Sequence, residues 1–166
     1  GFIHLDEDQD IDTTAHRKLI EKTGVASPYL EQVCSIGNKN RDPRGWSVTI
    51  LYFALIDYSM IKLIQKNTEE TKWFLIKDAD KIKLAFDHNE LLHKAALRLR
   101  SKTRYTALPV SLMPSLFTLT ELQAIFEIIL EVKLQKKAFR KRLLDANVVE
   151  GTNLNKISGK RPAQLY

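Results

Sequence analysis

The hydrophobic pattern predicts two helices in the first hundred residues. Apolar residues recur at helical spacing over 12–23, where Asp12 or Thr13 would cap the first turn and Gly24 would end the last turn in a left-handed conformation. A second amphipathic stretch covers 87–100. Both stretches carry charged residues on the opposite side, so each helix is expected to pack one face on a core.

Apolar runs between these helices predict strands. The run over 46–56 is apolar almost throughout and is therefore expected at the centre of a sheet. Trp46 and Trp73 occupy strand positions and are expected in the core, with a place at the rim of a base-binding site as the alternative. The segment 38–45 contains Pro and Gly and is expected to form a loop. The predicted strands are 29–37, 46–56 and 72–77.

A break follows over 101–115, where Pro109 and Pro114 interrupt the pattern. Beyond it, apolar spacing predicts a helix over 118–131, capped by Thr118 or Thr120. A second helix over 135–147, a strand over 148–150, a basic turn over 151–163 and a strand over 164–166 are expected to follow. Helix, basic helix and basic hairpin in this order are typical of a winged helix-turn-helix.

Positive charge is concentrated at the C-terminal end. The chain of 166 residues carries a net charge of +6. Residues 131–166 contain nine Lys or Arg and three Asp or Glu, so they account for the whole excess. A basic segment on a neutral body favours a polyanionic partner.

Seven of these basic residues are candidates for DNA contacts. The candidates in the predicted helix over 135–147 lie opposite Phe139 and Leu143, so they could reach base edges or phosphates in a major groove. Those of the hairpin could contact phosphates or enter the minor groove. A solvated charged surface is the alternative for any single lysine. The seven are Lys136, Lys137, Arg140, Lys141, Lys156, Lys160 and Arg161.

The segment 16–25 reads HRKLIEKTGV. It resembles the core of the Nudix box, R-E-U-x-E-E-x-G-U with U aliphatic, and the matching residues are Arg17, Leu19, Glu21, Gly24 and Val25. Lys18 and Lys22 stand where the Nudix family has glutamates. In Nudix hydrolases, clustered carboxylates hold divalent cations against a diphosphate.

Both lysines argue against hydrolysis. They remove hard oxygen ligands and bring positive charge to the place of the metal. In addition, nine residues separate Glu7 from Arg17, where the family has seven. We therefore expect no catalytic residues and no metal, while a diphosphate could still bind with Lys18 or Lys22 supplying part of the positive charge. A surface helix with ordinary solvated lysines is the alternative.

Two further segments carry candidate ligand residues. Arg41 and Arg44 lie in the loop RDPRG, where they could clamp phosphates or form a salt-bridged turn. His88, in LAFDHNELL, begins a helix and could contact a ligand or serve as a polar cap.

These segments resemble the NrtR family of Nudix-related transcriptional regulators of NAD metabolism, together with FTLTELQAIFEIILEVKLQKKAFRKRLL and SGKRPAQLY. The resemblance covers nearly the whole chain. It implies an α+β fold, with a Nudix-like α/β/α sandwich over 1–105, incomplete at its N-terminus, and a winged helix-turn-helix DNA-binding domain over 106–166. It also implies a homodimer that binds a palindromic operator in double-stranded DNA.

The resemblance further implies a repressor of NAD synthesis or salvage genes that ADP-ribose releases. A sensor that hydrolysed its effector would erase its own signal, so the lysines fit a domain that keeps the ligand without turnover. ADP-ribose is then an effector, and neither cofactor nor metal is needed. The expected ligand contacts are Arg17, Lys18, Glu21, Arg41, Arg44 and His88.

Two other functions remain open from the sequence. One is an active Nudix pyrophosphatase on ADP-ribose or a related dinucleotide, with the basic domain as a localising module. The other is an RNA-binding or scaffold protein. No apolar run approaches the roughly 20 residues that span a bilayer, so no membrane partner is expected. The single cysteine, Cys34, allows no internal disulfide, which fits a reducing, cytoplasmic location.

Overall fold

The computed structural model describes residues 3–4, 6–27, 29–57, 72–157 and 162–166. The chain divides into two compact units, Gly1–Arg98 (unit 1) and Leu99–Tyr166 (unit 2). The domain boundary between 105 and 106 stays a prediction. Within the described residues, no helix combines the length and apolar character that a membrane crossing requires.

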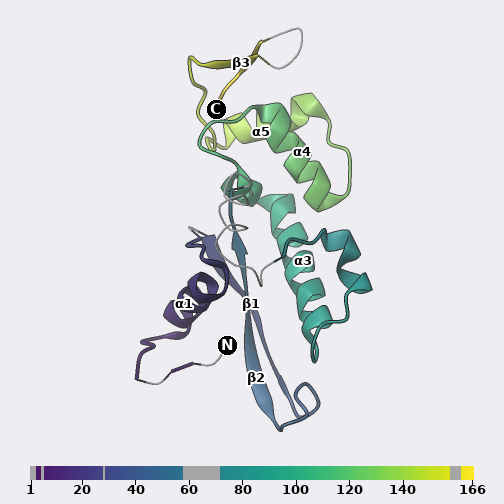
Figure 1. Cartoon of the computed structure of the whole chain (residues 1–166). Helices are drawn as coiled ribbons and strands as arrows, with labels where there is room; N and C mark the ends of the chain where they lie inside the picture. The colour runs from purple at the N-terminus through teal and green to yellow at the C-terminus, as the bar shows by residue number, and fades with distance from the viewer. Residues whose placement is uncertain (1–2, 5, 28, 58–71, 158–161) are drawn as a thin grey trace. The chain divides into compact units, whose positions relative to one another are not determined.

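Unit 1 is built on an antiparallel hairpin. Strand β1 (Tyr29–Asn38) pairs with β2 (Ser47–Leu55), and the register shifts between Gln32 and Cys34. Helix α1 (Ile11–Thr23) lies on one side of this hairpin, and the first part of α3 (His88–Tyr105) lies on the other (Figure 1). Helix, sheet and helix therefore form three layers.

Helix α1 begins earlier than predicted. Its N-cap is Asp10 rather than Asp12 or Thr13, because the Asp10 carboxylate accepts a hydrogen bond from the Thr13 backbone N–H at 2.6 Å. Asp12 instead lies in the first turn, where an acidic side chain is favoured by the helix dipole. Gly24 ends the helix in the left-handed region, with φ 69°, as predicted.

The first two predicted strands are confirmed to within two residues, but the third is wrong. Residues 72–75 have no regular structure, and the 3-10 helix η2 (Ile76–Lys81) follows them. A strand needs a partner for its backbone groups, and among the described residues β1 and β2 pair only with each other. The central position expected for β2 is therefore wrong for this part of the chain. The core positions of Trp46 and Trp73 are also wrong, since these residues are 69% and 45% exposed.

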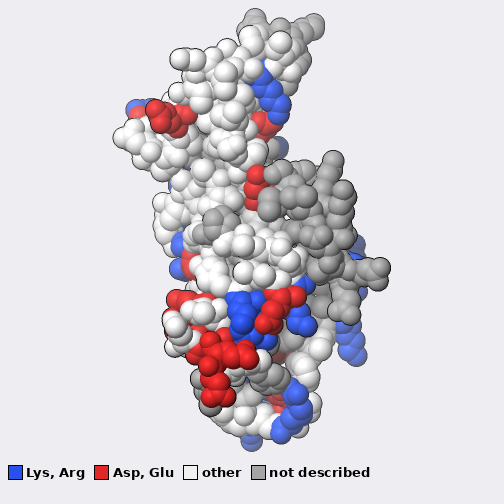
Figure 2. Space-filling model, turned by 60° about the vertical axis from the view of Figure 1, so that its left-hand side comes forward, with Lys and Arg blue, Asp and Glu red and all other residues white. Residues whose placement is uncertain are grey.

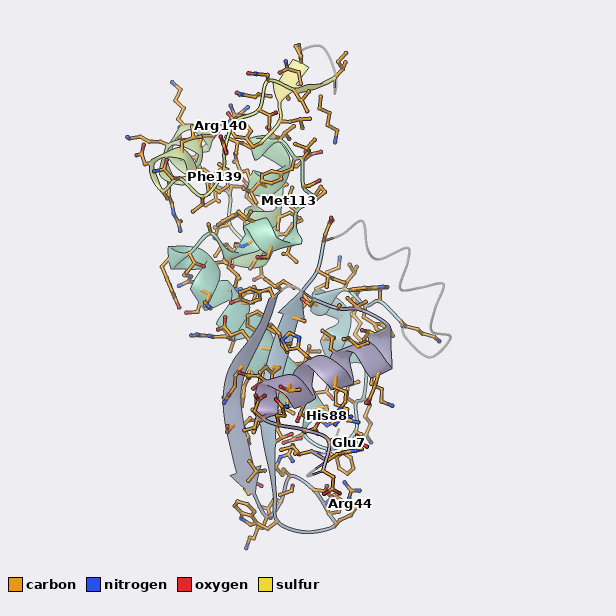
Figure 3. All side chains as sticks on the ribbon, turned by 90° about the vertical axis from the view of Figure 1, so that its left-hand side faces the viewer. Glu7, Arg44, His88, Met113, Phe139 and Arg140 are labelled. Carbon is orange, nitrogen blue, oxygen red and sulfur yellow. The ribbon has the colours of Figure 1, made fainter. Side chains whose placement is uncertain are left out.

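Unit 2 has one hydrophobic core. The elements of the unit after α3 are η3 (Leu108–Leu112), α4 (Leu119–Leu130), α5 (Lys136–Asp145), β3 (Asn155–Ile157) and β4 (Pro162–Gln164). The rings of Phe126 and Phe139 meet edge to face, with centroids 5.0 Å apart, and Met113 packs against the same core (Figure 3). The buried residues of the core are Phe117, Leu119, Leu122, Phe126, Phe139 and Leu143.

The hairpin β3–β4 is tied to the start of α4. The Tyr166 N–H donates to the Phe117 carbonyl at 2.8 Å, and the Phe117 N–H donates to the Tyr166 carbonyl at 3.2 Å. The Lys156 ammonium lies 2.6 Å from the Glu121 carboxylate. The described part of unit 2 thus has the predicted order of helix, basic helix and hairpin.

Three details of unit 2 differ from prediction. The strand predicted over 148–150 is wrong, because these residues form no strand and Val149 packs against the core. The strand predicted over 164–166 is displaced, because β4 shares only Gln164 with it and β3 lies inside the predicted basic turn. Helix α3 continues through Tyr105 into the predicted break, since no proline occurs before Pro109 in that segment. Lys160 and Arg161 lie outside the described residues.

We predict that Thr118→Ala lowers the free energy of unfolding of unit 2 by about 1 kcal/mol. Thr118 and Glu121 form a capping box in which the Thr118 hydroxyl accepts the Glu121 N–H at 3.2 Å. Urea unfolding of the whole chain, followed by far-UV circular dichroism, measures the change. Thr118→Ser keeps the hydroxyl and is expected to match the wild type. Equal loss in both variants would contradict the role of the cap.

Candidate functional site

The helix of the Nudix-like box carries a closed network of ion pairs. The Arg17 guanidinium reaches Asp8 and Glu21, each at 2.6 Å, and the Lys18 ammonium lies 2.8 Å from the other Glu21 oxygen. These hydrogen bonds from Lys18 and Arg17 lower the pKa of Glu21 to about 2. The Arg17 guanidinium likewise holds the pKa of Asp8 well below its ordinary value. On the face shown in Figure 2, acidic and basic side chains adjoin one another over the part of unit 1 that includes α1.

This network does not fit a divalent metal. Both Glu21 oxygens already accept hydrogen bonds from cations, and Lys18 and Lys22 replace the other carboxylates of the box. Among the described residues, no group of three or more His, Cys, Asp and Glu side chains is arranged as a set of metal ligands. Hard cations need several oxygen ligands, and Lys18 and Lys22 supply none at their positions of the box.

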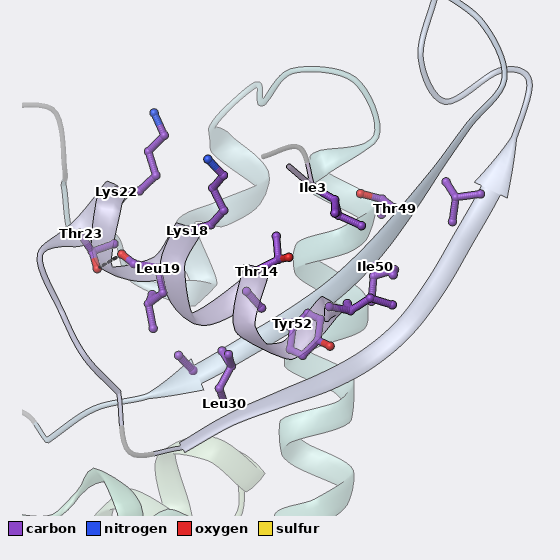
Figure 4. A pocket seen from close by; sticks show the side chains of 14 residues that line it. Ile3, Thr14, Lys18, Leu19, Lys22, Thr23, Leu30, Thr49, Ile50 and Tyr52 are labelled. Atoms are coloured by element: carbon purple, nitrogen blue, oxygen red, sulfur yellow. Dashed lines mark hydrogen bonds between the residues drawn. The ribbon is translucent and has the colours of Figure 1, made fainter. Parts of the chain in front are cut away.

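A pocket of about 600 Å³ lies between α1 and the hairpin. Lys18 and Lys22 line it one helical turn apart, and their side chains extend from α1 in the same direction (Figure 4). The rest of the lining is largely apolar and includes Leu19, Leu30 and Ile50. Two ammonium groups beside an apolar surface suit a ligand with both a negative and a non-polar part.

A second group of candidate residues lies where the loop between β1 and β2 meets the turn before α3. The Arg41 guanidinium donates two hydrogen bonds to the Asp87 carboxylate, both at 3.1 Å, and one to the Ser47 hydroxyl at 3.1 Å. The Arg41 side chain is only 9% exposed. Arg41 therefore joins two segments of unit 1, and its guanidinium already donates hydrogen bonds to Asp87 and Ser47.

Arg44 and His88 meet on the ring of Phe86. The Arg44 guanidinium lies 5.7 Å from the ring centroid, and the His88 ring packs against Phe86 edge to face at 5.9 Å. Arg44 also pairs with Asp42 at 2.6 Å and lowers the pKa of that carboxyl to about 2. Figure 3 labels Arg44 in the loop after β1 and His88 at the start of α3.

The structure therefore divides the six predicted ligand residues into two groups. Arg17, Lys18 and Glu21 share the network on α1, while the other three gather around Asp87 and Phe86. Sequence reasoning missed Asp42, Phe86 and Asp87, although the acidic residues beside Arg41 and His88 in RDPRG and AFDH were a usable signal.

The basic residues of α5 run along the helix from its exposed start. Lys136 and Lys137 occupy the first turn, which contains no acidic residue. Positive side chains at a helix N-terminus oppose the helix dipole, so an anionic partner would relieve an existing repulsion. Lys141 pairs with Asp145 at 2.8 Å.

Arg140 is partly held by its own unit. It donates to the Thr120 hydroxyl at 3.3 Å, and its buried Nε has no hydrogen-bond partner among the described residues. An unmet donor in a buried position costs free energy, so the Arg140 side chain is not fully satisfied by the contacts that the structure describes. The Arg140 guanidinium thus links α5 to the start of α4.

Glu127 fixes the turn between α4 and α5. Its carboxylate accepts hydrogen bonds from the Leu134 N–H at 3.0 Å and the Gln123 amide at 3.0 Å, and it pairs with Lys133 at 2.8 Å. Lys133 contributes most to lowering the pKa of Glu127 to about 2. Because α4 and the segment that precedes α5 meet at this carboxylate, it holds the connection between the two helices in place.

Known proteins resemble the chain in both units. The family model of the NrtR DNA-binding winged helix domain matches residues 109–166. The ADPR responsive transcriptional repressor NtrR of Acinetobacter baylyi is 60% identical over all 166 residues, and the chain spans 66% of the length of that relative. A crystal structure of Shewanella oneidensis NrtR complexed with a 27mer DNA matches at 40% identity with a TM-score of 0.94, covering 100% of this chain and 76% of that one.

The NUDIX domain of Shewanella oneidensis NrtR complexed with ADP ribose matches at 43% identity with a TM-score of 0.52, over 60% of this chain and 64% of that one. Together these matches confirm the predicted α+β fold, a Nudix-like part followed by a winged helix. The resemblance found in the box, the two loop segments and the basic C-terminal part is confirmed as well. The chain belongs to the NrtR family.

Proposed function

We propose that this chain is an ADP-ribose-responsive repressor that binds double-stranded DNA through unit 2 and represses genes of NAD synthesis or salvage. One observation carries the proposal: a winged helix whose α5 begins with basic residues and no acidic one coexists with a Nudix-box helix whose Glu21 carboxylate is held by two cations. The relative named as an ADPR responsive repressor supports it, as do the NrtR structures with DNA and with ADP ribose.

The proposed DNA contacts come from α5 and the hairpin. Lys136, Lys137 and Lys141 are exposed on α5, and Arg140 lies beside them. Lys156 belongs to β3, while Lys160 and Arg161 complete the proposed set from outside the described residues. Two such units in a homodimer would match a palindromic operator, because protein and operator then share twofold symmetry.

The proposed effector site binds ADP-ribose without turning it over. Lys18 and Lys22 at the pocket supply positive charge for a diphosphate, and no metal is required. Arg17 and Glu21 hold Lys18 and one another in place, whereas Arg44 and His88 contact other parts of the ligand. Arg41 acts by positioning the loop through Asp87.

Release from DNA requires that ADP-ribose binds better to an arrangement that does not bind the operator. A coupling of roughly 1–3 kcal/mol would be typical of such linkage. By the same linkage, operator DNA weakens ADP-ribose binding by an equal factor. The proposed repressor works in the cytoplasm, where its operator and its nucleotide effector are both available.

The test of this function is retention of sheared genomic duplex DNA on the immobilised whole chain. We expect sequencing of the retained DNA to show a palindrome near genes of NAD metabolism, and ADP-ribose to remove that enrichment. Single-stranded RNA competitor is the control and is expected to leave the enrichment unchanged. Absence of any enriched duplex at moderate salt would overturn the proposal, and preferential loss to RNA would support the RNA-binding alternative.

A pair of variants should separate the two activities. Arg140→Ala is expected to weaken operator binding about tenfold with unchanged ADP-ribose affinity, because Arg140 belongs to unit 2. Arg44→Ala is expected to blunt release by ADP-ribose with unchanged operator binding. Fluorescence anisotropy with labelled operator measures both. Lys94→Ala, which removes one exposed charge paired with Glu90, is the control. Equal damage to both activities by each variant would contradict the division.

ADP-ribose affinity is expected to be the same in EDTA and in Mg²⁺. The double variant Lys18→Gln/Lys22→Gln should weaken binding by about tenfold, since two cations beside the pocket are lost. Isothermal titration measures the affinity, and Lys81→Gln/Lys94→Gln removes two exposed lysines of unit 1 as the matched control. Release of AMP and ribose 5-phosphate with Mg²⁺ would instead support the pyrophosphatase alternative.

A further inference from the structure

Phe86 has a backbone conformation that its residue type disfavours. Its φ is 53°, in the left-handed region, where a bulky side chain is an outlier among non-glycine residues. The neighbouring turn leads directly into α3 at His88. Residues held in such conformations cluster at ligand sites, because the surrounding structure must maintain the strain.

Burial does not account for Phe86. The residue is 55% exposed, so its ring contributes little to a core. A turn that needs a left-handed residue is better served by glycine or asparagine. Neither packing nor turn geometry therefore explains why a phenylalanine occupies this position.

The surroundings of Phe86 hold its ring in one place. Asp87, the next residue, is fixed by the two hydrogen bonds from Arg41. The Arg44 guanidinium lies over the ring, and His88 packs against it at an interplanar angle of 67°. Two residues proposed to contact the effector thus meet on this one exposed ring.

We propose that Phe86 is the aromatic platform on which the adenine base of the nucleotide effector stacks, an assignment that rests on the proposed function. Adenine is the aromatic part of ADP-ribose, and an exposed ring offers it a flat apolar contact. The cation beside the ring serves the same ligand, because Arg44 places positive charge next to the stacked base of an anionic nucleotide.

The experiment is isothermal titration of ADP-ribose into the whole chain and three variants. Phe86→Asn removes the ring but suits the left-handed backbone, so we expect affinity to fall about tenfold while the thermal midpoint does not fall. Phe86→Tyr keeps the ring and is expected to retain affinity within about twofold. Trp46→Leu removes another exposed aromatic, whose ring lies against Gly37, and is the matched control with unchanged affinity.

The outcomes separate the two proposals. A wild-type chain that does not bind ADP-ribose overturns the proposed effector and the platform with it. Wild-type binding with unchanged affinity in Phe86→Asn overturns the platform alone. A lowered thermal midpoint together with weakened binding in Phe86→Asn, not rescued in Phe86→Tyr, would show that Phe86 is only a structural residue and would also overturn the platform.

Discussion

The arrangement of unit 1 around its proposed ligand depends on one ion pair, that of Arg41 and Asp87. The two residues are 46 positions apart, and both side chains are largely buried. Because removing one partner would leave a buried charge, the pair fixes the loop after β1 against the start of α3. Without this fixed point, Arg44 and Phe86 would belong to two independent segments.

Unit 2 uses a similar device at its own turn. The Glu127 carboxylate collects contacts from both sides of the α4–α5 connection, as Asp87 does for its loop. In each case a single carboxylate accepts two or more hydrogen bonds across a connection, and a cation of the same region, Arg44 or Lys133, stays exposed. Both turns thus leave positive charge exposed, beside the proposed nucleotide site in one unit and the proposed DNA-binding residues in the other.

Elements whose formation depends on residues close together in the chain could be predicted from the sequence. The spacing of Leu122 and Phe126 revealed α4, and Thr118 marked its start, since caps and helical faces are local properties. The segment 72–77 was misassigned because a strand is defined by a partner that can lie anywhere in the chain. The pairing of Asp87 with Arg41 could not be predicted for the same reason, although the acidic residue beside His88 was visible in the sequence. Phe86 gave no signal in the sequence, because its exposure and backbone conformation are properties of the folded chain.

The lysines on α1 bear on how such a domain can evolve. A glutamate at position 18 alone would lie one turn from Glu21 and would remove the ion pair between Lys18 and Glu21. The Glu21 carboxylate would still be held by Arg17. Restoring a glutamate at 22 alone would leave Lys18 bound to Glu21. Neither single step rebuilds a metal site, and the change at position 18 also removes an existing ion pair. A set of metal ligands on this helix would therefore require changes at both positions together, because neither substitution alone frees the Glu21 carboxylate from its cations.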